Sequence, residues 1–431
     1  MKNIFIALTT LLAAPAVAAE ANFPDLPPAA QVETALNNNL SVQTARTGIQ
    51  LEHANQRKWN SGNYEFNLRA GTAQRNVVNS GQNLKEWDVA LERPFRLYGK
   101  AQLDSSIGAE SVTRAESALS DARHEAGRLL LHLWFNWQRE QAQMSQWQQQ
   151  ADILRQQAQM TEKRMKSGDA PKMELNQAQA AVAQASVSLQ QARVRAQIAA
   201  NDLTRQFPGL TLPEQPMLAT PQTLEHDFAS WKDRVLQHNH ELDMVQADSR
   251  IQQLLAQRSR ADIMPDPTLG VRYASELGGN ERVTGVYFSV PLSLGLRSAT
   301  AEGAAYQAEI SANREAAVKR RLEGDVYNTH TQAVSNYATW QQASAAHASI
   351  RQNAELVARA YSLGESSLSD TLTARRLALE AALAANIAQL DANEARYRLL
   401  LDAHLLWQLD ANEDKHHEHQ DAFGAQSNMK E

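Results

Sequence analysis

The feature that most limits how this chain can fold is a very long stretch without proline. Residues 101–166 contain no proline and few glycines. Within them Leu129, Leu133 and Trp137 recur at four-residue spacing, which places them on one face of an α-helix. Such a helix would be about 100 Å long, at about 1.5 Å per residue. Because a helix of that length cannot pack against a compact core, it needs neighbouring helices along its whole length.

The same order of sequence signals occurs twice between residues 31 and 410. The corner RPFRLYGKA (93–101) corresponds to VPLSLGLRS (290–298), and a long helical run follows each of them. Each run is interrupted once, by MKSGDAPKMEL (165–175) in the first copy and by YSLGESSLSDTL (361–372) in the second. A repeat of this kind indicates a duplicated architecture. The sequence therefore predicts two long helical hairpins that pack side by side as coiled coils.

The duplication divides the chain at a proline-rich linker. Residues 207–225 separate the first repeat, 20–206, from the second, 226–410. Each repeat is predicted to contain a helix, a β-hairpin and a long helical hairpin. The β-hairpin and the helical hairpin are predicted at about 64–93 and 98–206 in the first repeat, and at about 267–290 and 297–409 in the second.

The two ends of the chain have different characters. Residues 1–19 combine an early cation, Lys2, with an apolar segment from Ile4 to Ala14 and small residues after it, which is typical of a cleavable secretory signal. Residues 411–431 are polar and lack helical periodicity, so we expect this tail to be disordered. The chain contains no cysteine. We therefore expect no disulfide, no thiolate metal site and no lipidated N-terminal cysteine.

Four short segments differ from the helices because apolar and polar residues alternate along them. In YEFNLRAG (64–71) the apolar residues Tyr64, Phe66 and Leu68 share one face, and polar residues occupy the other. This alternation is typical of a β-strand with one apolar face. We predict two β-hairpins from the segments 64–71, 84–93, 267–274 and 283–290, with polar, glycine-containing connections at 72–83 and 275–281.

These strands permit two arrangements. A four-stranded sheet packed on the helices would leave two open edges, and burying its charged face would be costly. A transmembrane barrel instead turns apolar residues toward lipid and polar residues toward a water-filled lumen. Even small barrels need about eight strands, so closure would require three copies that together supply twelve. In this arrangement the residues predicted to face the lumen are Glu65, Asn67, Arg69, Glu86, Asp88, Glu92 and Arg272.

The ordered set of signals resembles the TolC-like outer membrane efflux protein family over nearly the whole chain. The paired corners, 93–101 and 290–298, and the paired helix breaks, 165–175 and 361–372, carry the resemblance. It implies a mainly α-helical fold with a small β part. Duplicated antiparallel helical hairpins would form an α-barrel, and four transmembrane strands per chain would close a 12-stranded β-barrel in a trimer. It also implies a location in the outer membrane of a Gram-negative bacterium, with the helical part in the periplasm.

By this resemblance the protein is the passive exit duct of a tripartite efflux system. The partners implied are two further copies of the chain, a periplasmic membrane-fusion adaptor, an inner membrane pump and outer membrane lipid. The corner RPFRLYGKA also resembles the CzcC-like and CusC-like branch, which serves heavy-metal pumps of the resistance-nodulation-division (RND) type. Divalent heavy-metal cations are therefore the first candidate cargo. Multidrug or small-molecule efflux and type I secretion are alternatives for the same fold, and a soluble periplasmic coiled-coil scaffold or adaptor is the alternative of another class.

The resemblance places the two helix breaks at the periplasmic tip, where adaptor contacts and the narrowest aperture lie. Asp370 and Glu174, near the starts of the helices that follow, are predicted to form rings of acids at this aperture. Acids are also favoured at that position simply by the helix dipole. The residues predicted to contact the adaptor are Gly168, Asp169, Pro171, Gly364 and Glu365.

Histidines form the remaining candidate ligands. The tail sequence EDKHHEHQD offers His416, His417 and His419, which are ligand types suited to zinc, cobalt, nickel or copper(II). We expect no more than weak metal binding from a disordered tail. His238 and His240 are two residues apart on a predicted helix, so we expect them on different faces and at the surface.

The sequence contains no sign of several other function classes. It has no HExxH, GxSxG or phosphate-binding loop motif, so we expect neither an enzyme nor a cofactor. The formal charge is -6, and the lysines and arginines are scattered among acids, so we expect no nucleic-acid partner. Beyond the N-terminal segment no apolar run reaches about 18 residues, which argues against membrane-spanning helices.

Overall fold

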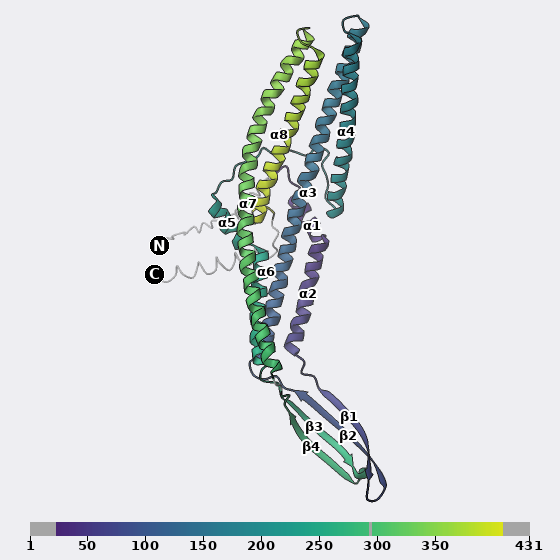
Figure 1. Cartoon of the computed structure of the whole chain (residues 1–431), viewed down its shortest axis with the longest axis vertical. Coiled ribbons are helices and arrows are strands. Elements are labelled where there is room, and N and C mark those ends of the chain that lie inside the picture. The colour runs from purple at the N-terminus through teal and green to yellow at the C-terminus, as the bar shows by residue number, and fades with distance from the viewer. Residues whose placement is uncertain (1–22, 293–294, 408–431) are drawn as a thin grey trace, which may run out of the picture.

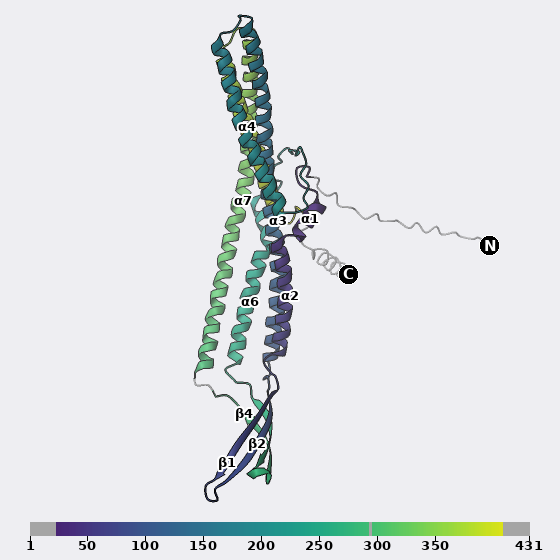
Figure 2. The ribbon, with the colours of Figure 1, turned by 90° about the vertical axis from the view of Figure 1, so that its right-hand side faces the viewer.

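The protein is an elongated molecule with a sheet at one end and two helix turns at the other (Figure 1). The computed structural model describes residues 23–292 and 295–407. The predicted signal segment 1–19 and the polar tail 411–431 lie outside the described residues. Between the two ends, long helices run the length of the molecule, as the view turned by 90° also shows (Figure 2).

Corresponding helices of the two halves have nearly the same lengths. The two longest have 67 residues each, the helices that follow them have 35 each, and the two helices that precede the strands have 22 each. The helices are α1 (Ala29–Asn37), α2 (Leu40–Ser61), α3 (Lys100–Lys166), α4 (Lys172–Gln206), α5 (Phe228–Gln237), α6 (His240–Ala261), α7 (Leu296–Ser362) and α8 (Leu368–Asp402).

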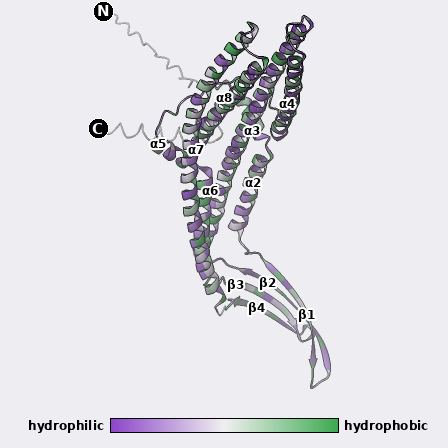
Figure 3. Cartoon of the chain, turned by 45° about the horizontal axis from the view of Figure 1, so that its top comes forward, coloured by the Kyte–Doolittle hydropathy of each residue, from purple (hydrophilic) through white to green (hydrophobic). Residues whose placement is uncertain are grey.

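The long helices form two antiparallel hairpins. Helix α3 returns through α4, and α7 returns through α8, while α2 and α6 pack beside the sheet-proximal halves of α3 and α7 (Figure 2). At 67 residues, α3 and α7 are each about 100 Å long. The predicted mainly helical fold with long paired helices is confirmed. Hydrophobic and hydrophilic residues are interspersed along these helices (Figure 3), and none of the described helices is apolar enough over its length to cross a membrane.

The small β part is one antiparallel sheet in the order β1-β2-β3-β4. Its strands are β1 (Asn67–Val77), β2 (Gln82–Pro94), β3 (Thr268–Glu276) and β4 (Glu281–Ser289), and the 3-10 turn η1 (Leu277–Gly279) joins the last two. The first hairpin is longer than predicted, because most of the connection expected at 72–83 is strand. Pairing continues from Thr72 opposite Trp87 to Val77 opposite Gln82. Polar cross-strand pairs extend this strand where apolar alternation has ended.

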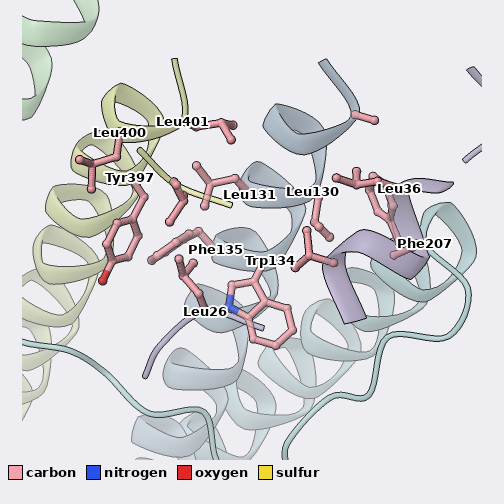
Figure 4. Packing of buried hydrophobic residues seen from close by; sticks show 14 of the residues in the cluster. Leu26, Leu36, Leu130, Leu131, Trp134, Phe135, Phe207, Tyr397, Leu400 and Leu401 are labelled. Atoms are coloured by element: carbon pink, nitrogen blue, oxygen red, sulfur yellow. The ribbon is translucent and has the colours of Figure 1, made fainter. Parts of the chain in front are cut away.

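The main hydrophobic core lies at the middle of the molecule, where α3 crosses the ends of α4 and α8. Leu131 and Phe135 of α3 are buried against Tyr397 and Leu401 of α8 (Figure 4). The N-terminal segment contributes Asp25, whose carboxylate accepts hydrogen bonds from the Tyr397 hydroxyl at 2.7 Å and from the Asn393 amide at 3.0 Å. This core joins the two halves of the duplicated chain into one unit.

Candidate functional site: a two-faced sheet and two helix turns

The cross-strand register gives the sheet one apolar face. Residues directly opposite each other point to the same side, so Leu68, Val89, Val271 and Val286 share a face. None of the described helices covers this face, and Leu68 and Val286 expose 68% and 71% of their surface. The other large exposed hydrophobic residues on this face are Trp87, Leu91, Leu269, Tyr273 and Phe288.

The opposite face carries paired charges. Arg75 lies 2.6 Å from Glu86, and Arg272 lies 3.6 Å from Asp88. The Tyr287 hydroxyl donates to Glu92 at 2.6 Å. The structure brings six of the seven predicted lumen residues onto this one face: Asn67, Arg69, Glu86, Asp88, Glu92 and Arg272. Their role in a lumen stays a prediction.

The first strand begins later than expected, and this changes the place of Tyr64. Strand β1 starts at Asn67, so Tyr64 and Glu65 lie before it. The Tyr64 hydroxyl donates to Asp266 at 2.7 Å, and the Arg96 guanidinium lies 4.6 Å from the ring centre. Burial, followed by the neighbouring Asp266 carboxylate, raises the pKa of Tyr64 to about 12. Tyr64 therefore ties the sheet to the helices and does not continue the apolar face.

The connection between sheet and helices is centred on Lys100, the first residue of α3. Its side chain is only 2% exposed, and its ammonium group lies 2.9 Å from both Asp262 and Asp266 and donates to the Met264 carbonyl at 2.8 Å. Burial opposes ionisation of Asp266, but hydrogen bonds from Tyr64 and Lys100 lower its pKa overall. A buried cation that has three acceptors is well compensated. Lys100 belongs to the corner 93–101 that the sequence repeats, but no neighbouring residue in the sequence indicated that its side chain is buried.

The two helix turns at the other end of the molecule have the same geometry. Gly168 has a φ of 85° and Gly364 a φ of 82°, a conformation that favours glycine. The next residues, Asp169 and Glu365, each donate their backbone amide to a carbonyl five residues earlier, at 2.8 and 2.9 Å. Pro171 lies at the N-cap of α4, directly before its first helical residue.

The two predicted aperture acids occupy equivalent places but make different contacts. Glu174 and Asp370 are the third residues of α4 and α8. Asp370 is exposed and accepts a hydrogen bond from the Ser367 hydroxyl at 2.7 Å, while its backbone amide donates to Ser367 at 3.1 Å. This is a helix-capping contact. Glu174 is half-buried, and the aperture role of both acids stays a prediction.

Sequence reasoning missed Tyr361, which connects the two turns. Its hydroxyl donates to Glu174 at 3.2 Å across the two hairpins, and the Arg164 guanidinium lies 5.2 Å from its ring centre. Tyr361 is the second-last residue of α7 and was visible at the start of the second helix break. In the sequence, the signal that could have indicated this contact was an aromatic residue next to a polar turn.

Solved structures with a similar architecture show which fold this chain has. The chain superposes on the CmeC outer membrane channel of Campylobacter jejuni with a TM-score of 0.73 and 15% identity, covering 97% of both chains. The chain has the fold of a TolC-like outer membrane channel. It also matches the outer membrane protein VceC of Vibrio cholerae (TM-score 0.71, 15% identity, 88% of this chain and 99% of that one). A third match is the transmembrane channel protein CusC (TM-score 0.68, 17% identity, 88% and 91%).

Sequence comparison alone finds no such similarity. No family model matches the chain, and no curated protein matches it. Among the solved structures, the similar TM-scores of CmeC and CusC do not favour the heavy-metal branch over other channels of this fold. The predicted metal ligands His416, His417 and His419 lie outside the described residues.

Proposed function

We propose that three copies of this chain close their sheets into one barrel of twelve strands and form an outer membrane channel. The observation that carries the proposal is a sheet of four strands with two open edges and an uncovered apolar face. Within the described residues, β1 and β4 each pair with one strand only. Pairing β4 of one copy with β1 of the next satisfies both edges and turns the apolar face toward lipid.

The channel would be the passive exit duct of a tripartite efflux system in a Gram-negative outer membrane. Its helical part would extend into the periplasm and meet a membrane-fusion adaptor and an inner membrane pump. Two observations support this: the fold is that of outer membrane channels, and the helix turns at 167–171 and 363–367 lie at the end farthest from the sheet (Figure 1). The charged side chains of Arg69, Glu86 and Asp88 would keep the lumen of the barrel filled with water.

We propose the periplasmic end as the narrowest point, with Glu174 and Asp370 near it. Three copies would bring three of each acid to the aperture. In the single chain Glu174 is held by Tyr361, and Asp370 is held by the capping contact with Ser367. Opening would have to alter the first of these contacts, because it joins the two hairpins.

Divalent heavy-metal cations, exported by an RND-type pump, are the cargo that we propose first. The support comes from the sequence: the corner RPFRLYGKA resembles the heavy-metal branch, and the tail carries three histidines. Cargo is tested by deleting the gene and measuring tolerance to zinc, cobalt, cadmium, copper and a panel of drugs. Loss of metal tolerance supports this cargo. If metal tolerance is unchanged and the cells become hypersensitive to drugs, the metal cargo is ruled out and multidrug efflux is favoured.

Cell fractionation tests the channel itself. We expect the protein in the outer membrane as a trimer that migrates as such in mild detergent and dissociates on heating. A monomer in the periplasmic extract would overturn the proposal and favour a coiled-coil scaffold.

A further inference from the structure

A cavity of about 490 Å³ lies where the sheet meets the helices. The ends of α2 and α6 and the beginnings of α3 and α7 lie at this junction (Figure 2), and each of these four helices contributes to the wall of the cavity. Its volume is within the range of about 300 to 1,000 Å³ that is usual for small-molecule sites. All the lining residues belong to one chain, so the cavity is formed without a second copy.

This junction cavity has more positive than negative side chains in and beside its wall. The lining acids are Asp104, Asp262 and Asp266. The five cations are Lys58, Arg258 and Arg297, which also line the cavity, and Arg96 and Lys100, which are ion-paired with the acids. At neutral pH the cluster therefore carries an excess of two positive charges, which attracts anions.

The three carboxylates are already paired with three of the cations. The Arg258 Nε lies 2.5 Å from Asp104, and the Arg96 Nη1 lies 3.3 Å from the same carboxylate. Lys100 lies 2.9 Å from Asp266, and Asp262 is paired with both Lys100 and Arg258. These acids are therefore compensated within the wall and do not neutralise the remaining two cations.

The remaining cations are Lys58 and Arg297. Within the part of the chain that the structure describes, neither forms an ion pair with a carboxylate. The Arg297 Nη1 donates to the backbone carbonyl of Asp262 at 2.9 Å, which holds the guanidinium at the wall but leaves its charge uncompensated. Lys58 is exposed and extends from the last turn of α2. Both charges are therefore available to a bound anion.

The duplication shows that Arg297 is more than a structural ion-pair partner. The corner 93–101 corresponds to 290–298, so Arg297 occupies the place of Lys100 in the second copy. Lys100 is 2% exposed and has two carboxylates at 2.9 Å, whereas Arg297 has one backbone carbonyl. The second copy thus supplies the cation of this corner without the counter-ions that it has in the first.

We propose that the junction cavity binds a phosphate group, with Lys58 and Arg297 as the cations that contact it. An arginine fork binds two phosphate oxygens at once, and a lysine ammonium adds a point charge. An excess of two positive charges matches a phosphate ion or phosphate ester. Asn55, which also lines the cavity, offers an amide donor to a third oxygen.

Two sources can supply this phosphate: a phospholipid headgroup or phosphate dissolved in the periplasm. Trp59 and Tyr64 line the cavity, and such rings are typical of the headgroup level of membranes. Phe66, two residues beyond Tyr64, exposes 66% of its surface. These features favour the lipid, and only this source rests on the proposed outer membrane channel. Phosphate binding itself does not depend on it.

Titration calorimetry with inorganic phosphate tests the site in the purified full mature protein, in a non-ionic detergent at constant ionic strength. We expect saturable binding of one phosphate per chain. Lys58→Gln and Arg297→Gln should each weaken binding by about tenfold, since each removes one charged hydrogen bond to the anion. Because Lys58 is exposed and is not ion-paired among the described residues, its variant should unfold at the same denaturant concentration as the parent.

Native mass spectrometry with added phosphatidylglycerol distinguishes the two sources. Retention of one lipid per chain by the parent, and its loss in both cavity variants, would identify the bound phosphate as a lipid headgroup. Binding of inorganic phosphate without the lipid would support the site with a soluble source.

Arg57→Gln is the matched control, because it removes one positive charge from the neighbouring position of α2 and Arg57 is not part of the cavity wall. It should bind each probe like the parent. Absence of binding for both probes, or equal binding by the Lys58→Gln, Arg297→Gln and Arg57→Gln variants, would overturn the proposal. Trimer formation is scored on the same samples. Phosphate binding by a protein that stays monomeric would support this site and contradict the channel.

Discussion

Helices α3 and α7 have the same length and opposite environments. Their first residues are Lys100, which is 2% exposed, and Leu296, which is 74% exposed. At equivalent places farther along, α3 buries the polar Gln138 completely, whereas α7 leaves the apolar Val334 50% exposed. The distribution of polar and apolar residues is thus partly inverted between two helices that occupy matching positions in the duplication.

The difference arises from what surrounds each helix. Helix α3 packs against α2, α4, α6 and α8 of its own chain, while α7 packs mainly against α6 and α8, with a short contact to α5. The duplication has repeated the lengths of the elements and not their surroundings. An apolar position that one chain leaves uncovered fits an architecture completed by further copies, as the proposed trimer requires.

The largest expected effect on stability comes from replacing the first residue of α3 and comparing it with the same change at the first residue of α7. Lys100→Ala would leave the carboxylate of Asp266 without its cation, while Asp262 would keep its ion pair with Arg258. Breaking a buried pair costs about 3 to 5 kcal/mol. Leu296→Ala should change stability by no more than about 0.5 kcal/mol, because this side chain contacts little. Denaturant unfolding of the purified protein measures both. Equal effects of the two substitutions would show that Lys100 does not hold the junction.

The sheet offers a sharper comparison between neighbouring residues on opposite faces. Val286→Lys puts a charge on the apolar face, at a cost of about 2 to 4 kcal/mol if that position lies in the bilayer. Gly285→Lys puts the same charge on the polar face, where an added Cβ meets open space. The yield of outer membrane trimers should fall for the first variant only. Equal tolerance at both positions would contradict the assignment of the lipid face.

A smaller effect is expected at the helix turns. Tyr361→Phe removes the hydroxyl that bonds Glu174 and keeps the ring beside Arg164, so the loss is about 0.5 to 1.5 kcal/mol. Faster amide hydrogen exchange in residues 165–175 would report the loosened contact. Met165→Leu, at the equivalent place in α3, is the control and should leave exchange unchanged. If Tyr361→Phe also leaves it unchanged, the cross-hairpin contact does not restrain the turns.

The smallest effect concerns the dependence of stability on pH, to which the half-buried Asp266 and the buried Asp25 should contribute with opposite signs. The Asp266 pKa is lowered, so its stabilising contribution is complete above the unfolded pKa of about 3.9 and is lost as pH falls through the folded pKa. Burial raises the pKa of Asp25, so its contribution improves as pH falls from neutrality through that pKa. Thermal melts of Asp266→Asn and Asp25→Asn between pH 3 and 7 should differ from the parent in opposite directions.

Sequence patterns were sufficient for the elements with strong periodicity. The long helices follow from proline-free runs of helix-forming residues, and the helix breaks at Gly168 and Gly364 follow from turn chemistry. The faces of the strands follow from alternation, which fixes which residues share a side. The exact extent of β1 did not follow, because polar cross-strand pairs such as Arg75 with Glu86 extend it.

Contacts between distant parts of the chain could not be predicted. Lys100 meets Asp266, Tyr361 meets Glu174, and His404 meets His240 only because the hairpins lie side by side. His238 and His240 were expected on separate faces of one helix. The expectation of separate faces was wrong, because Asn239 caps α6 between them and both rings turn toward His404. His238 is exposed, as expected.

Closure of the barrel is tested most directly by cross-linking, for which the absence of native cysteine is an advantage. Thr72→Cys in β1 is combined in turn with a cysteine at Arg282, Thr284, Val286 or Phe288 of β4, all on the apolar face. If β4 of one copy pairs with β1 of the next, one of these combinations should form disulfide-linked trimers in outer membranes under oxidation. Monomers in every combination, or linked dimers without trimers, would contradict a barrel closed by three chains.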